Sequence, residues 1–213
     1  MDHWLAAESA AGPKRGVRIN GLSTLDGFAD VAALAGAIGA ADFLMIPKAG
    51  GAAELGNLFA AIGQTCPPLW PIIESAAGLE SAFAIAAAPG VAGVLFGGAD
   101  YSADLGASMT WEALAYARGR LAAACAASGV ELLDVPYLDV KDVEGLASST
   151  ARAHALGFTG RACIHPDQIA AVHAAFTPTA DDIAHARRVL AALDSAHGAA
   201  ALRDGLLGEK PII

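Results

Sequence analysis

The chain has 213 residues, the length of one large domain, so we expect a single domain over residues 1–213. Apolar residues make up 55% of it and charged residues 16%, which excludes a disordered acidic protein. The formal net charge is −9 and the 13 basic residues are spread thinly, which excludes a nucleic-acid-binding surface. No apolar span of about 20 residues and no secretory leader stand out, so we expect a cytoplasmic protein without a membrane partner.

Short apolar segments alternate along the chain with alanine-rich segments of helical periodicity. The predicted strands are residues 16–20, 43–47, 69–74, 92–97, 131–135 and 161–165. The predicted helices are residues 26–39, 51–63, 78–88, 111–128, 142–156 and about 181–197. Thr110 and Gly129 are the expected caps at the two ends of the helix predicted at 111–128. Thr179 with Asp182 resembles a capping box at the start of the last helix.

The six predicted strands are continuous apolar runs, which indicates burial on both faces. Buried strands joined by helices form parallel sheets, so the fold class is α/β. Two architectures fit, a doubly wound sheet and a (β/α) barrel. No Gly-x-Gly-x-x-Gly follows a strand, since Gly97-Gly98 continues as Ala99-Asp100, and this argues against a dinucleotide-binding sheet.

Charged residues follow the predicted strands where functional groups of parallel α/β folds collect. Glu74 and Asp100 end consecutive strands, which lie about 4.8 Å apart in a sheet. Two neighbouring carboxylates repel each other unless a cation or a proton intervenes, and Mg²⁺ suits them. The sequence therefore predicts Glu74 and Asp100 as metal ligands, with helix or turn capping by each carboxylate as the alternative.

Two further strand ends add positive charge at the same edge of the predicted sheet, which we call the rim. The planar guanidinium of Arg18 can bind a carboxylate or thioester oxygen in two directions. Lys48 fits a substrate contact and, equally, an ion pair with one of the two carboxylates. We interpret His165 as a hydrogen-bonded structural residue and Asp104 as a residue that caps or braces its loop.

Taken in order, these segments resemble the citrate lyase beta-subunit-like branch of the HpcH/HpaI aldolase family. The matching segments are VRIN at 17–20, MIPK at 45–48, IIESAAGL at 72–79, FGGAD at 96–100, GFTGRACIHPDQI at 157–169 and FTP at 176–178. The resemblance implies a TIM-type (β/α) barrel. Members of the family usually begin with two more βα units, to which nothing here corresponds, so we expect an incomplete barrel of about six parallel strands.

The resemblance also implies an enzyme, a Mg²⁺-dependent carbon–carbon lyase acting on a 3-hydroxy-3-carboxyacyl thioester of citryl, malyl or citramalyl type. It makes Glu74 and Asp100 catalytic metal ligands and Arg18 the catalytic residue that binds substrate and steadies the thioester enolate. The expected partners are an acyl-CoA or acyl-carrier thioester and further copies of the chain, because the family forms trimers. Two alternatives remain: an aldolase acting on free 2-oxo acids, and a non-catalytic homologue acting as a binding or assembly subunit.

Overall fold

The computed structural model describes residues 12–34, 41–196, 199–201 and 207–209. The contacts between residues divide the chain into two compact units, Met1–Val172 and His173–Ile213. The predicted strands and most of the predicted helices belong to the first unit. The single domain over residues 1–213 stays a prediction.

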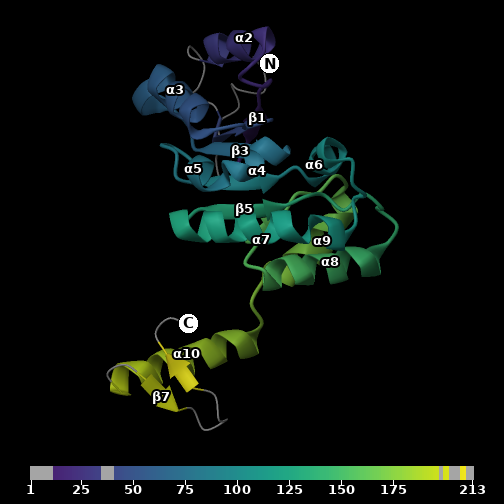
Figure 1. Ribbon diagram of the computed structural model, residues 1–213. Helices are drawn as coiled ribbons and strands as arrows, with labels where there is room; N and C mark the ends of the chain where they lie inside the picture. The colour runs from purple at the N-terminus through teal and green to yellow at the C-terminus, as the bar shows by residue number, and fades with distance from the viewer. Residues whose placement is uncertain (1–11, 35–40, 197–198, 202–206, 210–213) are drawn as a thin grey trace. The chain divides into compact units, whose positions relative to one another are not determined.

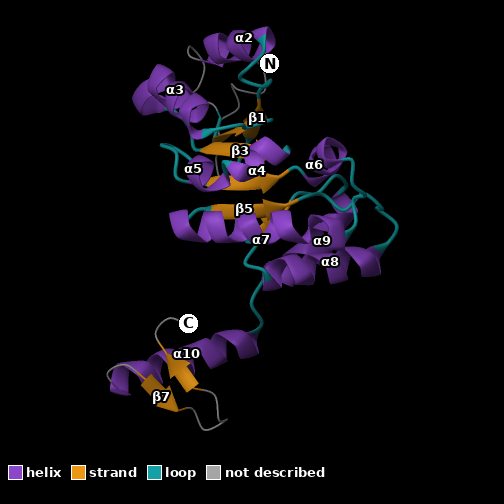
Figure 2. Ribbon diagram, viewed as in Figure 1, coloured by secondary structure: helices purple, strands orange, loops and turns teal. Residues whose placement is uncertain are grey.

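The first unit is built on a sheet of six strands (Figures 1 and 2). In chain order these are β1 (Gly16–Arg18), β2 (Phe43–Ile46), β3 (Leu69–Ile73), β4 (Gly93–Phe96), β5 (Glu131–Asp134) and β6 (Gly160–Arg161). Each strand pairs in parallel with the next one along the chain, and the spatial order is β1-β2-β3-β4-β5-β6. A doubly wound sheet reverses its strand order, whereas a (β/α) barrel keeps it. The prediction of a partial TIM-type barrel with six parallel strands is therefore confirmed.

Helices connect the strands of the first unit, as Figure 2 shows in purple. They are α2 (Leu25–Leu34), α3 (Ala52–Ile62), α4 (Ala76–Glu80), α5 (Ala82–Ala86), α6 (Gly98–Leu105), α7 (Trp111–Ser128), α8 (Val143–Ala155) and α9 (Ile169–Phe176), with short 3-10 turns η2 (Gly63–Thr65) and η3 (Pro166–Gln168). The helix predicted at 78–88 is two short helices, α6 and α9 were not predicted, and residues 35–39 of the helix predicted at 26–39 lie outside the described residues. No described helix is long and apolar enough to cross a bilayer.

The ends of α7 illustrate how local sequence sets the helix limits. The Thr110 hydroxyl accepts a hydrogen bond from the Ala113 N–H at 3.4 Å, which satisfies one of the free donors of the first turn. At the other end Gly129 adopts a left-handed conformation with φ 67°, and its N–H bonds back to the last turn. The observed bounds of α7 agree with the predicted ones.

The hydrophobic core lies along one face of the sheet and continues through the whole of β4. Every residue of β4 is buried, whereas β2 alternates between the buried Leu44 and Ile46 and the half-buried Phe43 and Met45. The prediction that all six strands are buried on both faces is therefore wrong for β1, an edge strand without a buried residue, and for β2 and the similarly alternating β5. For β2 and β5 the reason is that their second face borders an apolar cavity of about 430 Å³, lined in part by Phe43, Met45 and Trp70.

The second unit contains α10 (Ala180–Ala196) and a two-stranded antiparallel ribbon of β7 (Ala199–Ala201) and β8 (Leu207–Glu209). Before α10, the Thr179 hydroxyl donates to Asp182 Oδ2 at 2.6 Å and accepts from the Asp182 N–H at 3.1 Å. This reciprocal pair confirms the predicted capping signal at the start of the helix. The ribbon was not predicted.

Candidate metal and substrate site

Glu74 stands directly after β3, at the carboxyl end of the sheet. The next residue, Ser75, caps α4 by accepting a hydrogen bond from the Gly78 N–H at 3.1 Å, so the chain turns away from the strand there. The Glu74 side chain is half-buried, and its Oε1 accepts the backbone N–H of Lys48 at 2.7 Å. A carboxylate held by a backbone donor from the neighbouring strand end has a defined orientation.

Lys48 has an unusual backbone conformation at this contact. Its φ is 55°, in the left-handed region that costs a residue with a side chain about 1–2 kcal/mol. The hydrogen bond from its N–H to the Glu74 carboxylate is of the charge-assisted kind that can offset such a cost. The backbone conformation of the loop after β2 therefore depends on the hydrogen bond between Lys48 and Glu74.

Asp100 lies in the first turn of α6, one strand along from Glu74, with an exposed side chain. Its carboxyl lies within hydrogen-bonding reach of the Glu74 carboxyl. Burial is the main cause that raises the pKa of Glu74, and the hydrogen bond and negative charge of Asp100 raise it further. The Lys48 N–H and ammonium group lower it. The two carboxyl groups thus form a site where a proton or a cation relieves repulsion.

Gly97 makes room for this pair. A Cβ atom built on Gly97 would lie 2.5 Å from Glu74 Cβ and 2.9 Å from Glu74 Oε2. It would also lie 3.1 Å from Ile72 Cγ2, so Ile72 and Glu74 share the face of the sheet toward which Gly97 is open. Any side chain at position 97 would displace Glu74 from its present position.

Arg18 lies at the end of β1 on the same face of the sheet. Arg18 lies beside Met45 of β2, and Met45 lies beside Trp70 of β3. Residues two positions apart in a strand share a face, so Trp70 and Ile72 are on the same face of β3. The Arg18 side chain is exposed and makes no hydrogen bond or ion pair with the residues that the structure describes. The rim thus carries a guanidinium whose donors are available to a ligand.

The structure also shows the contacts of three further residues for which the sequence led to predictions, Lys48, Asp104 and His165. Within the described ranges the Lys48 ammonium group forms no ion pair. The predicted alternative, an ion pair with one of the two carboxylates, is therefore not observed. Asp104 accepts the Ala76 N–H at 2.8 Å and so braces the start of α4, as expected. His165 Nδ1 accepts the Asp167 N–H at 3.2 Å and caps η3, which is the expected structural role.

The donor set suits a hard divalent cation that keeps free coordination positions. Among the described residues no group of three or more His, Cys, Asp or Glu side chains could hold a metal. A cation at Glu74 and Asp100 would therefore take its other ligands from water and substrate, as Mg²⁺ does when it is bound by one or two carboxylates. The pair fits Mg²⁺ and lacks the nitrogen and sulfur donors that zinc prefers.

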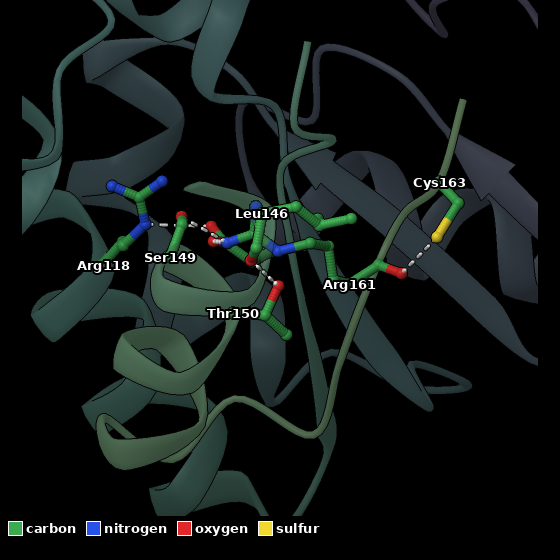
Figure 3. A network of polar contacts seen from close by, with 7 residues as sticks. Arg118, Leu146, Ser149, Thr150, Arg161 and Cys163 are labelled. Carbon is green, nitrogen blue, oxygen red and sulfur yellow. Dashed lines mark hydrogen bonds and ion pairs between the residues drawn. The ribbon is translucent and has the colours of Figure 1, made fainter. Parts of the chain in front are cut away.

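Sequence reasoning missed a second polar cluster, at the end of β5 (Figure 3). The fully buried Asp134 carboxylate accepts Arg118 Nε at 3.0 Å through Oδ1 and Arg161 Nη2 through Oδ2. Arg161 Nη2 also donates to Ser149 Oγ at 2.9 Å. The signal was present in the sequence, because Arg118 interrupts the apolar stripe that Leu114 and Leu121 define on α7.

The fold and the paired carboxylates agree with what sequence comparison finds. The sequence model of the family described as HpcH/HpaI aldolase/citrate lyase matches residues 2–166. The chain belongs to this family. The match covers the region that carries Arg18, Lys48, Glu74 and Asp100 and ends just after β6.

Individual members of the family cover most of the chain. It is 37% identical to a "Citrate lyase subunit beta-like protein" of Mycobacterium tuberculosis over 204 residues, which are 92% of this chain and 71% of that protein. It is 36% identical to a "(3S)-malyl-CoA thioesterase" of Cereibacter sphaeroides, over 91% of this chain and 68% of that protein. The solved structure of CitE from M. tuberculosis with magnesium, acetoacetate and coenzyme A superposes with a TM-score of 0.76, at 36% identity over 92% and 73% of the two chains.

Proposed function

We propose that this protein is a Mg²⁺-dependent carbon–carbon lyase. Its substrate is a 3-hydroxy-3-carboxyacyl thioester of citryl, malyl or citramalyl type, and its products are an acyl thioester and a 2-oxo acid. The observation that carries the proposal is the position of Glu74 and Asp100, which follow the neighbouring strands β3 and β4 at one edge of the sheet, where Asp100 raises the pKa of Glu74. Family membership and a relative whose structure contains magnesium, acetoacetate and coenzyme A support it.

Glu74 and Asp100 are the residues that would hold Mg²⁺. A bound Mg²⁺ supplies Lewis-acid polarisation and charge neutralisation for carboxylate and hydroxyl oxygens of a substrate. The protein prepares for it by fixing Glu74 Oε1 on the Lys48 N–H, next to Asp100. The open position at Gly97 keeps the two carboxyl groups in reach of each other.

Arg18 and Lys48 bind the substrate's anionic groups in this proposal. The fork of donors on Arg18 hydrogen-bonds the thioester oxygen as negative charge develops there, an effect often worth about 3 kcal/mol in such sites. The Lys48 ammonium group, which has no carboxylate partner among the described residues, is available to a substrate carboxylate. Both groups lie on the rim that the carboxyl ends of β1 and β2 form.

The test is a product assay with citryl-, malyl- and citramalyl-CoA, with and without Mg²⁺. A lyase releases acetyl-CoA and the matching 2-oxo acid, and chelation by EDTA abolishes the release. Carrier-protein thioesters of the same acids, assayed in parallel, decide between coenzyme A and a carrier protein. If no thioester is cleaved and free 4-hydroxy-2-oxo acids release pyruvate instead, the aldolase alternative replaces the proposal.

A second candidate is hydrolysis of the thioester, which the similarity to a protein named (3S)-malyl-CoA thioesterase favours. The two reactions differ in their products, since hydrolysis of malyl-CoA releases free coenzyme A and malate. A thiol reagent that reports free coenzyme A therefore separates them in one sample. Absence of all these products, in a protein that binds Mg²⁺, would support the non-catalytic binding subunit.

A further inference from the structure

A second cavity lies beside β5, and it is lined by arginines. Its volume is about 540 Å³, and its wall includes Trp111 and Arg118 of α7, Ser149 and Arg152 of α8, Asp139, and Arg161 of β6. Arg18, Lys48, Glu74 and Asp100 take no part in its lining. Figure 3 shows Arg118, Ser149 and Arg161, which come from three separate elements, in one network of polar contacts.

The arginines at the back of this cavity have more positive charge than their neighbours balance. Arg118 and Arg161 share a single carboxylate, that of Asp134, and the exposed fractions of the three side chains are 5%, 1% and 0%. Arg118 Nη1 and Arg161 Nε are buried and have no hydrogen-bond partner among the residues that the structure describes. An unpaired buried donor or charge costs free energy, and a bound anion would recover part of that cost.

Two guanidinium groups of the cavity wall lie against one aromatic ring. Arg118 Cζ lies 4.3 Å from the centre of the Trp111 ring, and Arg152 Cζ lies 4.1 Å from it. Stacking uses the faces of the guanidinium planes and leaves donors on their edges. Arg152 has only one long contact to a carboxylate, 3.5 Å to Glu112 Oε1, and its side chain is 49% exposed.

The acidic residues at and near the wall keep their negative charge, but neutral donors of neighbouring residues hold their carboxylates in place. Of the described residues that line the cavity, Asp139 is the single acidic one, and its Oδ1 already accepts the Lys141 N–H at 3.0 Å. Nearby, Asp142 accepts the Tyr137 hydroxyl at 2.6 Å and the Gly145 N–H at 2.8 Å, and these bonds lower the pKa of its carboxyl. Both carboxylates are thus engaged with donors of their own loop.

We propose that this cavity binds a phosphate group. Three arginines, two of them stacked on one aromatic ring, together with two buried donors that lack a described partner, match the geometry and charge with which arginine recognises phosphate. The inference does not depend on the lyase reaction. The phosphate has two possible sources: a free phosphorylated metabolite that acts as an effector, or the phosphate-bearing end of coenzyme A.

Isothermal titration of the full-length, metal-free protein with inorganic phosphate tests the site. We expect saturable binding of one phosphate per chain, with a Kd of about 0.1–1 mM. Arg152→Gln, which removes a half-exposed side chain, should weaken binding at least ten-fold, and Arg118→Lys should do the same. Arg187→Gln on α10 removes an equal charge from an exposed position outside the cavity, and it should bind phosphate like the wild type.

Competition with coenzyme A identifies the source. If coenzyme A displaces phosphate and Arg152→Gln weakens both, the cavity holds a phosphate of coenzyme A. If both bind together, the ligand is a separate phosphorylated molecule. No saturable binding to the wild type up to about 10 mM phosphate would overturn the proposal, and so would equal weakening by Arg152→Gln and Arg187→Gln. Because no Mg²⁺ and no thioester are needed, these results are independent of the lyase assay.

Discussion

The ionisation of Glu74 depends on groups from two neighbouring strand ends. Burial and Asp100 favour its neutral form, whereas the Lys48 N–H and ammonium group favour the carboxylate. Asp104 provides a contrast nearby, since its Oδ2 is used to brace the Ala76 N–H. Two acidic residues of the same helix, α6, therefore have different roles.

Removing either carboxylate of the pair should weaken Mg²⁺ binding. We expect Glu74→Gln and Asp100→Asn each to lower the affinity at least ten-fold, because one carboxylate alone leaves the cation one strong ligand. Titration calorimetry with MgCl₂ measures the effect. Asp104→Asn is the matched control and should leave Mg²⁺ affinity nearly unchanged; unchanged affinity in both Glu74→Gln and Asp100→Asn would dismiss the assignment.

The raised pKa of Glu74 also predicts how stability depends on pH. A carboxyl group whose pKa is higher in the folded state binds its proton more tightly there, so the free energy of unfolding falls as pH rises from 4.5 through the raised pKa. Glu74→Gln removes this term. The Tm of the metal-free wild type should therefore decline relative to Glu74→Gln across that window and then run parallel to it. Mg²⁺ affinity of the wild type should rise over the same window, because proton and cation compete.

Calorimetric scans of both proteins from about pH 4 to pH 8 give the comparison. Asp104→Asn serves as the control for a general loss of negative charge. A constant difference in Tm between wild type and Glu74→Gln at every pH would contradict the predicted protonation of Glu74.

Arg18 is expected to act on substrate and to contribute little to the fold. It is exposed at the end of β1, and among the described residues it has no side-chain partner. Arg18→Lys keeps the charge and loses the planar fork, so kcat/KM should fall about 100-fold while Tm changes by less than about 1 °C. Arg187→Lys makes the same exchange at an exposed position of α10. A large loss of Tm with retained turnover would show that Arg18 is structural.

At the scale of elements, the junction of β4 and α6 determines whether the carboxylate pair can form. Gly97 gives its N–H to Ile73 O at 2.9 Å, so the backbone of this junction lies close against the end of β3. The absence of a side chain at Gly97 leaves the space that Glu74 occupies. The site thus depends on strand packing as much as on the acidic residues themselves.

Gly97→Ala should disturb the site through this packing. The added Cβ would lie 2.5 Å from Glu74 Cβ, so the two backbones must separate, at a cost of about 1–3 kcal/mol. We expect a lower Tm and a Mg²⁺ affinity reduced at least ten-fold, measured by calorimetry. In Gly119→Ala, on the exposed side of α7, the new Cβ meets no atom within 4 Å. This control should gain about 0.5–1 kcal/mol of stability and keep Mg²⁺ affinity; similar behaviour of both variants would count against the packing argument.

At the scale of the whole molecule, the sheet of the first unit has two strands with one partner each. In the described part of the chain β1 pairs with β2 alone and β6 with β5 alone. Unpaired strand edges tend to associate, and α2 adds exposed apolar side chains, with Leu25 86% and Phe28 65% accessible.

We therefore predict that the protein associates with itself, and the habit of the family favours a trimer. Light scattering after size exclusion, over a range of micromolar concentrations, should give a mass above that of one 21.3 kDa chain. Binding of an apolar dye at low concentration should decrease as the oligomer forms. A monomer that melts in one sharp transition and binds no dye would contradict the prediction.

The sequence by itself determined the parts of this protein that depend on near neighbours. Short apolar runs located five strands of the sheet closely and the sixth only at its start, since the strand predicted at 161–165 is observed at Gly160–Arg161, and the Thr110 and Gly129 caps set the limits of α7. The strand ends also located Glu74 and Asp100 at one edge, because parallel strands place their carboxyl ends together. These signals lie within a few residues of the structure that they specify. The short helix α6 was not predicted because eight residues are too few to show a clear helical period of apolar residues.

Only the tertiary structure decided how distant residues meet. The Lys48 N–H reaches Glu74 across 26 positions of sequence, and Arg161 reaches Asp134 across 27. Such contacts depend on strand register, on a left-handed backbone at Lys48 and on the space left by Gly97. None of these has a local signature, because packing between separate strands and helices determines them. The arginine-lined cavity is therefore visible only when α7, α8 and β6 are in place.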